Sequence, residues 1–179
     1  STRQGRQSHK LAAWVAANLK DQADVEVLDL RDFPIPFIDE AISPRYNPER
    51  KTDEQTQKWL DAMAPFDGYV LVTPEYNRST SALLKNAIDV LGHEIDDKPV
   101  ALVAHGSTGG AQAVASLRMA VPGVGAITLP QALFFNDHLA DSISDDGELK
   151  KEVAERPYGP QGQLETQVAT LLKYAQALK

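Results

Sequence analysis

Three short segments of this sequence combine hydroxyl, basic and glycine residues in a way that suits an anion. They run from Ser1 to Ser8, from Thr73 to Ser81 and from His105 to Gly110. Hydroxyls and backbone N–H groups at the start of a helix form a site for a phosphate group, and the helix dipole reinforces it. The chemistry that these segments indicate is therefore the binding of an anionic ligand.

The first of these segments leads directly into a helical pattern. Arg3 and Arg6 offer charge-assisted hydrogen bonds to an anion, and Ser8 stands where a helix cap is expected. A second interpretation stays open from this segment alone, namely a solvated N-terminus with an ordinary serine cap.

Redox chemistry in this chain requires a bound cofactor. The 179 residues include no cysteine, which excludes disulfides, thiolate metal sites and a thiol nucleophile. The histidines at positions 9, 93, 105 and 138 show no spacing typical of a metal site, so we expect no metal. Electrons would have to travel through a cofactor that the protein holds.

The net charge of -7 restricts the partners that this chain can bind. A field of that sign repels nucleic acid and anionic membranes, and we expect neither as a partner. The apolar runs are far shorter than the ~20 residues of a membrane span, and the first residues do not read as a signal peptide. The expected location is the cytoplasm.

Helical and strand patterns alternate along the chain. Apolar residues at helical spacing predict helices at 11–19, 56–63, 80–91, 111–121 and 164–178. Apolar runs predict strands at 25–30, 68–73, 99–104 and 126–129, the last ended by Pro130. Continuous apolar strands are typical of a parallel sheet that helices cover on both faces. We therefore predict one α/β domain over residues 1–179, a doubly wound parallel sheet in three α/β/α layers.

Two parts of this domain depart from the simplest pattern. The polar stretch from Asp137 to Pro160 is interpreted as a long surface connection. A doubly wound domain normally begins with a buried strand, whereas Ser1 is already in the loop that should follow one. We expect a first strand upstream of Ser1 in the natural protein, the alternative being a domain built without it.

The second segment carries the most specific signature. Pro74-Glu-Tyr-Asn77 followed by Leu84-Lys-Asn-Ala-Ile-Asp89 resembles the signature of the NADPH-dependent FMN reductase family, which includes related quinone reductases and azoreductases. Ser1-Thr-Arg3 with Ser8 is similar to the first phosphate loop of that family. The glycines around Ser107 are similar to its third loop.

The resemblance implies a flavodoxin-like fold that binds FMN and takes hydride from NADPH or NADH. It implies that the first loop, helped by Asn77, holds the phosphate and that the other two loops line the ribityl chain and the ring. The residues that it assigns to FMN are Ser1, Arg3, Ser8, Pro74, Glu75, Tyr76, Asn77, His105, Gly106, Ser107 and Gly110. Glycines suit this task because they let the backbone approach the ring.

No acid or base is required for hydride transfer to a flavin, so we name no catalytic residue. Two residues depart from the usual family pattern. Arg78 stands where a small residue is common and either narrows the substrate cleft or points to solvent, and His105 stands where an aromatic residue is common. Structural interpretations of the loops also stay open, with Asn77 in a left-handed turn and Gly109-Gly110 as a simple turn before a helix.

Three functions are compatible with these patterns. The first is a reductase that passes hydride from NAD(P)H through FMN to a small molecule, namely a quinone, an azo compound, free flavin or a metal oxyanion. The second is a flavodoxin-type electron carrier that docks to a protein, and the third is an interaction protein that has lost its cofactor. The resemblance also implies a homodimer or homotetramer, with the helix from Thr80 to Leu91 as the expected interface.

Overall fold

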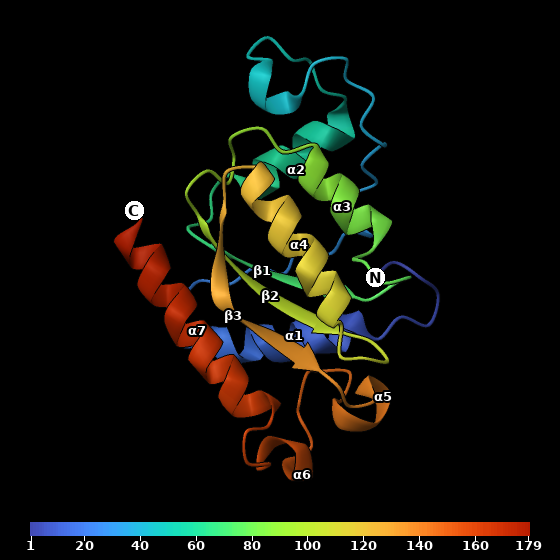
Figure 1. Cartoon of the computed structure of the whole chain (residues 1–179), viewed down its shortest axis with the longest axis vertical. Helices are drawn as coiled ribbons and strands as arrows, with labels where there is room; N and C mark the ends of the chain where they lie inside the picture. The colour runs from blue at the N-terminus through green and yellow to red at the C-terminus, as the bar shows by residue number, and fades with distance from the viewer.

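A parallel three-stranded sheet forms the centre of the computed structural model, which describes residues 1–179 (Figure 1). Its strands lie in the order β1 (Tyr69–Pro74), β2 (Pro99–His105) and β3 (Ile127–Phe135). The helices are α1 (Ser8–Leu19), the 3-10 helix η1 (Pro44–Tyr46), α2 (Glu54–Met63), α3 (Ala82–Asp89), α4 (Ala111–Gly123), α5 (Leu139–Ser142), α6 (Lys151–Ala154) and α7 (Pro160–Ala177). The predicted α/β class is confirmed.

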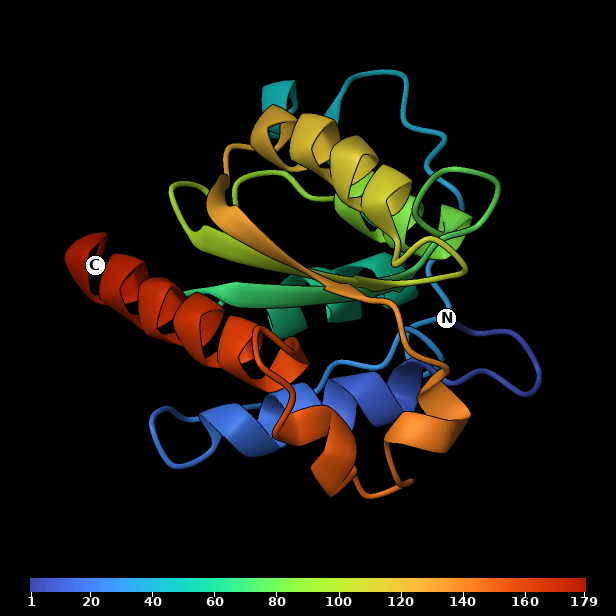
Figure 2. The same ribbon diagram turned by 60° about the horizontal axis from the view of Figure 1, so that its bottom comes forward.

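Alternate residues of β2 face opposite sides of the sheet, and each side is covered by its own helices. Val100, Leu102 and Ala104 belong to the larger core, with apolar residues of α2, α3 and α4. Val103 belongs to a second core, with residues of α1 and α7. Figure 2 shows α1 and α7 below the sheet and α4 above it. The three layers follow from the period of two in a strand that is buried on both faces.

The strand register brings the carboxyl ends of all three strands to one rim. Pro74 of β1 lies opposite His105 of β2, and His105 lies opposite Phe135 of β3. The loops that follow these strands therefore begin side by side. The N-terminal end of α1 points to the same rim, because the Ser8 side chain contacts His105.

The predicted strand from Val25 to Leu30 is wrong. The segment has no regular secondary structure, and Val27 is 54% exposed. Leu28 and Leu30 still pack against the larger core. A strand needs a hydrogen-bonded neighbour, and this segment pairs with no strand of the chain. The outer edge of β1 is likewise unpaired, and the expected upstream strand stays a prediction.

The strand predicted to stop at Pro130 continues to Phe135. A proline fits here because β3 is an edge strand and its register shifts between the residues opposite Val100 and Leu102. The irregular backbone is hydrogen-bonded by two side chains. Arg118 donates to the carbonyls of Leu129 and Pro130 at 3.0 and 2.6 Å, and Gln167 donates to that of Gln131 at 3.2 Å.

The stretch from Asp137 to Pro160 is more ordered than a surface connection. It contains α5 and α6, and its apolar residues Leu139 and Ile143 are buried in the core beneath α1. Isolated apolar residues in a polar stretch gave no helical period to detect. The terminal helix α7 is confirmed and begins four residues before its predicted start, at Pro160. None of the helices combines the length and apolarity needed to cross a membrane.

The close approach of Gly110 to β2 generates a stability prediction. Gly110 has φ +86°, and an added Cβ would lie 2.5 Å from the Ala104 Cβ. Gly110→Ala should lower the free energy of unfolding by about 3 kcal/mol, from left-handed strain and overpacking together. Urea denaturation measures this.

Gly123 in α4 supplies the matched control, because nothing lies within 4 Å of an added Cβ there. Gly123→Ala should be neutral or stabilising by about 0.5 kcal/mol. Equal unfolding midpoints for the two variants would contradict the assigned role of Gly110.

Candidate cofactor-binding site

Arg6 fixes the first loop to the extended segment after α1. Its guanidinium forms a two-pronged ion pair with Asp29, with one N–O distance of 2.8 Å, and donates to the Ser1 carbonyl at 3.0 Å. The hydrogen bond from Arg6 lowers the pKa of the Asp29 carboxyl below its usual value. Arg6 is therefore engaged in holding the loop and is not free for an anion, contrary to expectation.

The first loop contacts the second through Tyr76. The Tyr76 hydroxyl lies 2.6 Å from the Ser1 Oγ. The Arg3 guanidinium carbon lies 5.3 Å from the centre of the Tyr76 ring, a cation–π distance. Arg3 has no carboxylate partner, so its charge remains available at the rim.

The second loop makes a tight two-residue turn. The backbone of Tyr76 and Ser79 exchanges hydrogen bonds of 2.9 and 3.0 Å. The residues between them have positive φ, 49° at Asn77 and 69° at Arg78. This is the geometry of a type I′ turn, for which asparagine is well suited. The structural interpretation of Asn77 as a left-handed turn residue is confirmed, and it leaves a ligand role at the same rim untested.

Glu75 joins the second loop to the third. Its backbone N–H donates to the His105 carbonyl at 2.8 Å. Its carboxylate accepts from the Thr108 hydroxyl at 3.2 Å and from the Gln112 N–H at 2.9 Å. A carboxylate on the first turn of α4 is favourable for the helix dipole. Both oxygens are therefore directed toward the start of α4, although the two neutral donors leave the charge of the carboxylate in place.

Ser8 and His105 link the first loop to the third. The Ser8 Oγ lies 2.7 Å from the His105 Nε2, and Ser8 is only 4% exposed. Burial, with a smaller effect from the Ser1 amine, lowers the pKa of His105 to about 4. At neutral pH the ring is therefore uncharged. The direct phosphate contact expected of Ser8 stays a prediction.

Unpartnered N–H groups are grouped at the rim. Those of Gln4, Gly5 and Gln7 in the first loop, and of Ser107 and Thr108 in the third, have no acceptor within the chain. Gly109 has φ +71°, and a Cβ there would overlap Asn136, so the third loop needs glycine. Backbone donors, hydroxyls and the charge of Arg3 form a set that fits a phosphorylated cofactor.

The residues expected at the cofactor site belong to three loops that contact one another at this rim. Pro74 and His105 are opposite in the ladder, and Gly106 lies against Glu75. Three neighbours were missed from sequence: Asp29, Phe134 and Asn136. The last two escaped because β3 was expected to end at Leu129. Phe134 is 38% exposed and lies beside Gly109.

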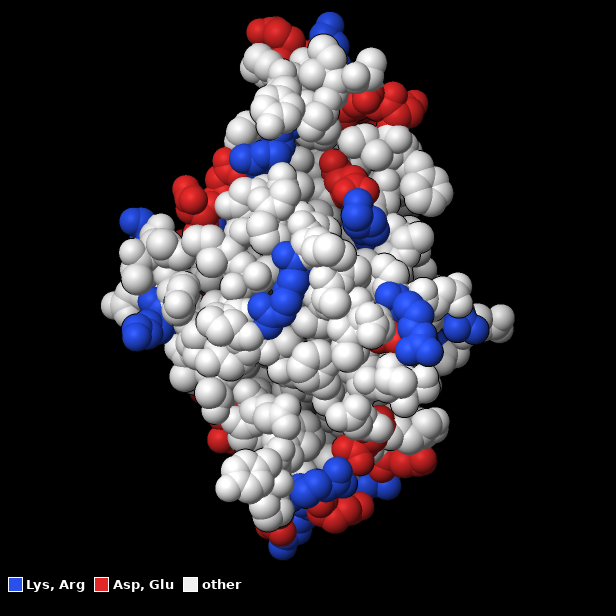
Figure 3. Space-filling view, in the orientation of Figure 1, with Lys and Arg blue, Asp and Glu red and all other residues white.

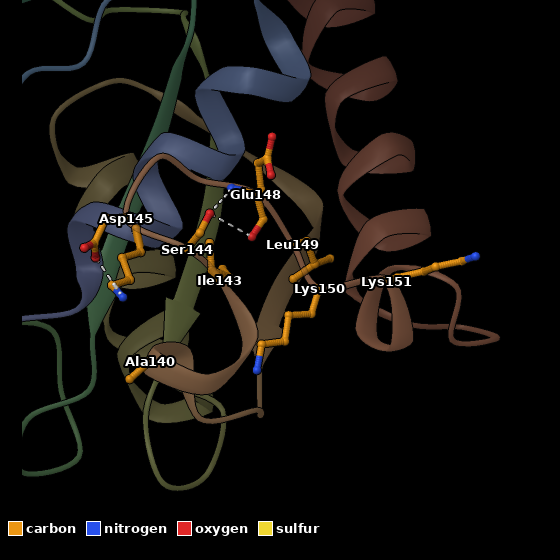
Figure 4. A pocket seen from close by; sticks show the side chains of 9 residues that line it. Ala140, Ile143, Ser144, Asp145, Glu148, Leu149, Lys150 and Lys151 are labelled. Carbon is orange, nitrogen blue, oxygen red and sulfur yellow. Dashed lines mark hydrogen bonds and ion pairs between the residues drawn. The ribbon is translucent and has the colours of Figure 1, made fainter.

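Two hollows of the surface contain none of the expected site residues. One, of about 560 Å³, lies between Lys10 and the loop from Ile143 to Lys151 (Figure 4). Asp145 points to the Lys10 amine at 2.8 Å, and Ser144 bonds to the backbone of Glu148. The other, of about 280 Å³, lies between α3 and α4.

Comparison with known proteins supports the same assignment. The sequence model of NADPH-dependent FMN reductases matches residues 1–140. The chain is 34% identical to an NAD(P)H-dependent FMN reductase of Schizosaccharomyces pombe, over 87% of this chain and 84% of that protein. It is 35% identical to an NADPH azoreductase of a Bacillus species, over 77% and 74%. The flavoenzyme FerB of Paracoccus denitrificans superposes with a TM-score of 0.77 and 23% identity, over 99% and 94% of the two chains, and shows the fold.

The buried, neutral His105 generates a pH prediction. Its pKa lies near 4 in the folded protein and near 6.5 in the unfolded chain, so the unfolded chain binds the proton more readily. Relative to His105→Gln, the free energy of unfolding should therefore fall as the pH drops from about 6.5 to about 4, by at most about 3 kcal/mol. NMR titration of the ring and denaturation at several pH values measure this.

His93 is an internal control in the same titration. It is exposed, and its hydrogen bond to Asp96 raises its pKa above 6.5. A midpoint for His105 at or above that of His93 would show that the ring is not buried as described.

Proposed function

Because the chain belongs to the NADPH-dependent FMN reductase family, we propose that it passes hydride from NADPH or NADH through bound FMN to a small acceptor. The acceptor classes that we propose are a quinone, an azo compound, free flavin and a metal oxyanion. FMN supplies the redox chemistry when bound, because it accepts hydride from a nicotinamide and passes electrons on. The single observation that carries the proposal is the meeting of three donor-rich loops at one rim of a parallel sheet.

The residues of the rim divide into those that would bind and those that would position. Arg3, the free N–H groups of the first loop and the α1 dipole would hold the phosphate. The free N–H groups of Ser107 and Thr108 would face the ring, where negative charge grows on reduction. Arg6, Glu75 and the Ser8–His105 pair hold the three loops together. No side chain is assigned an acid or base role.

The electron-carrier alternative gains no support from the relatives, because those described above have the names of reductases and an azoreductase. A carrier reacts poorly with NAD(P)H alone, whereas a reductase oxidises it. Turnover of NAD(P)H by the isolated protein therefore separates the two functions. A cytoplasmic location stays a prediction.

We also propose that the protein is a dimer or tetramer, but not through the apolar face of α3. Leu84, Ala87 and Ile88 of α3 are buried in the chain's own core, so that face is unavailable. The exposed apolar side chains lie nearby instead. Ile42, Tyr46 and Met119 are 53%, 81% and 77% exposed, and Met119 shares the hollow between α3 and α4 with residues next to Ile42 and Tyr46.

The FMN prediction tests the proposed function directly. The purified protein mixed with FMN should retain flavin absorbance after gel filtration and oxidise NADPH or NADH. FMN at 100 times its dissociation constant should raise the free energy of unfolding by about 2.7 kcal/mol. Absence of both flavin retention and NAD(P)H oxidation would overturn the proposal and favour a protein that has lost its cofactor.

Riboflavin, which lacks the phosphate, is the matched ligand for this experiment. Arg3→Ala should weaken FMN binding by roughly tenfold and leave riboflavin binding nearly unchanged, because the lost bond is to the phosphate. Lys173→Ala, at an exposed cation of α7 with no hydrogen bond or ion pair, should alter neither. Equal losses for both ligands in Arg3→Ala would remove Arg3 from the phosphate site.

The oligomer prediction concerns the surface around Met119. The wild-type protein should sediment as a dimer or larger, and Met119→Asp should shift it toward one chain, because a charge in an apolar interface is costly. Leu178→Asp, at a residue 44% exposed near the C-terminus, is the control. A wild-type monomer that still oxidises NADPH would contradict the oligomer and leave the reductase intact.

A further inference from the structure

Arg78 has a left-handed backbone conformation, which glycine adopts more readily than arginine. It is the second residue of the tight turn between Tyr76 and Ser79, with φ 69°. Glycine is strongly preferred there, because the left-handed region brings Cβ too close to the following carbonyl oxygen. An arginine at this place is therefore strained, and strain of this kind persists at sites where the side chain has a function.

The side chain of Arg78 is also free, unlike that of any other arginine in the chain. Arg78 is exposed and has no hydrogen bond, ion pair or aromatic contact. The others are engaged: Arg6, Arg45, Arg50 and Arg156 with carboxylates, Arg118 and Arg31 with carbonyl oxygens, and Arg3 with the Tyr76 ring. Nothing within the folded chain explains a guanidinium at the strained position.

Arg78 lies in the loop that we propose to line the flavin. It directly follows Asn77 in the loop proposed to line the flavin, and Tyr76 ties that loop to Arg3. Lys and Arg atoms are visible in Figure 3 at the edge where Figure 1 places the N-terminus. In a chain of net charge -7, the charges of Arg3 and Arg78, neither of which has a carboxylate partner, create a local field that attracts anions.

We propose that Arg78 is a specificity-determining residue that binds a tetrahedral oxyanion group on a substrate entering the cleft. A guanidinium recognises such a group through two parallel N–H donors. Two substrates of the proposed function carry this chemistry: NADPH, through its 2′-phosphate, and an oxyanion acceptor such as chromate. This inference rests on the proposed function, because it assumes that the rim is the substrate cleft.

The test compares Arg78→Gly with the wild-type FMN-loaded protein. Glycine relieves the strain, so the variant should melt about 2–4 °C higher while losing the anion contact. One arm measures flavin reduction by NADPH and by NADH in stopped flow. The second arm measures reoxidation of the reduced protein by chromate and by neutral benzoquinone.

The expected result is a loss of about tenfold in kcat/KM for NADPH or for chromate, with the matched substrate of that arm, NADH or benzoquinone, unchanged. A loss confined to NADPH identifies the 2′-phosphate as the ligand, and a loss confined to chromate identifies the acceptor. Arg78→Lys should recover part of the loss, because it keeps the charge without the fork. Added salt should reduce the preference for the anion in the wild type only.

Tyr158 provides a matched control for the strain. It also has a positive φ, 56°, and is 98% exposed. Tyr158→Gly should raise the melting temperature similarly and leave both substrate ratios unchanged. Unchanged ratios in Arg78→Gly, or equal losses for both substrates of each arm, would overturn the role of Arg78. Neither result would affect FMN binding and NAD(P)H oxidation by the wild type, which test the proposed function separately.

Discussion

The alignment of strand ends is the constraint on which the rest of this structure depends. Pro74, His105 and Phe135 lie side by side because parallel strands paired in register finish at one edge of the sheet. The loops that leave this edge therefore begin side by side. Helices on both faces bury the strands, and ligands in such sheets bind outside the carboxyl ends. The candidate site is therefore a consequence of topology before any side chain is considered.

Engaged side chains are the second feature of the rim. The Asp29 carboxylate is paired with Arg6, and the Glu75 carboxylate accepts hydrogen bonds from two donors at the start of α4. His105 is held neutral by burial. These contacts hold the loops in place. They leave the unpartnered N–H groups of the first and third loops, and the charge of Arg3, available to a ligand. A chain of net charge -7 thereby acquires a local site for a phosphate.

Four left-handed residues lie together at the same rim. Asn77, Arg78, Gly109 and Gly110 belong to its second and third loops, whereas Asp97, Gly125, Gly147 and Tyr158 have positive φ elsewhere in the chain. Gly109 and Gly110 adopt this conformation without strain because they lack Cβ, and asparagine, at position 77, tolerates it. Arg78 alone is there against its conformational preference. The turn geometry explains asparagine and glycine at the first three positions, but it does not explain arginine at position 78. A function of the Arg78 side chain at the cleft is the explanation that we propose.

The sequence by itself determined the α/β class, the strands β1 and β2 and the helices with a clear apolar period, because these depend on local spacing. It also indicated the three loops, since their residue types stand at the ends of apolar strands. Only the tertiary structure decided that Val25–Leu30 forms no strand, that β3 passes through Pro130, and that Arg6 is paired with Asp29. Each of these depends on a partner distant in sequence: a neighbouring strand, Arg118 bonded to bulge carbonyls, and a carboxylate from another loop. The pattern of residue types along a short segment carries no information on such partners. The packing of the sheet and its helices brings them together.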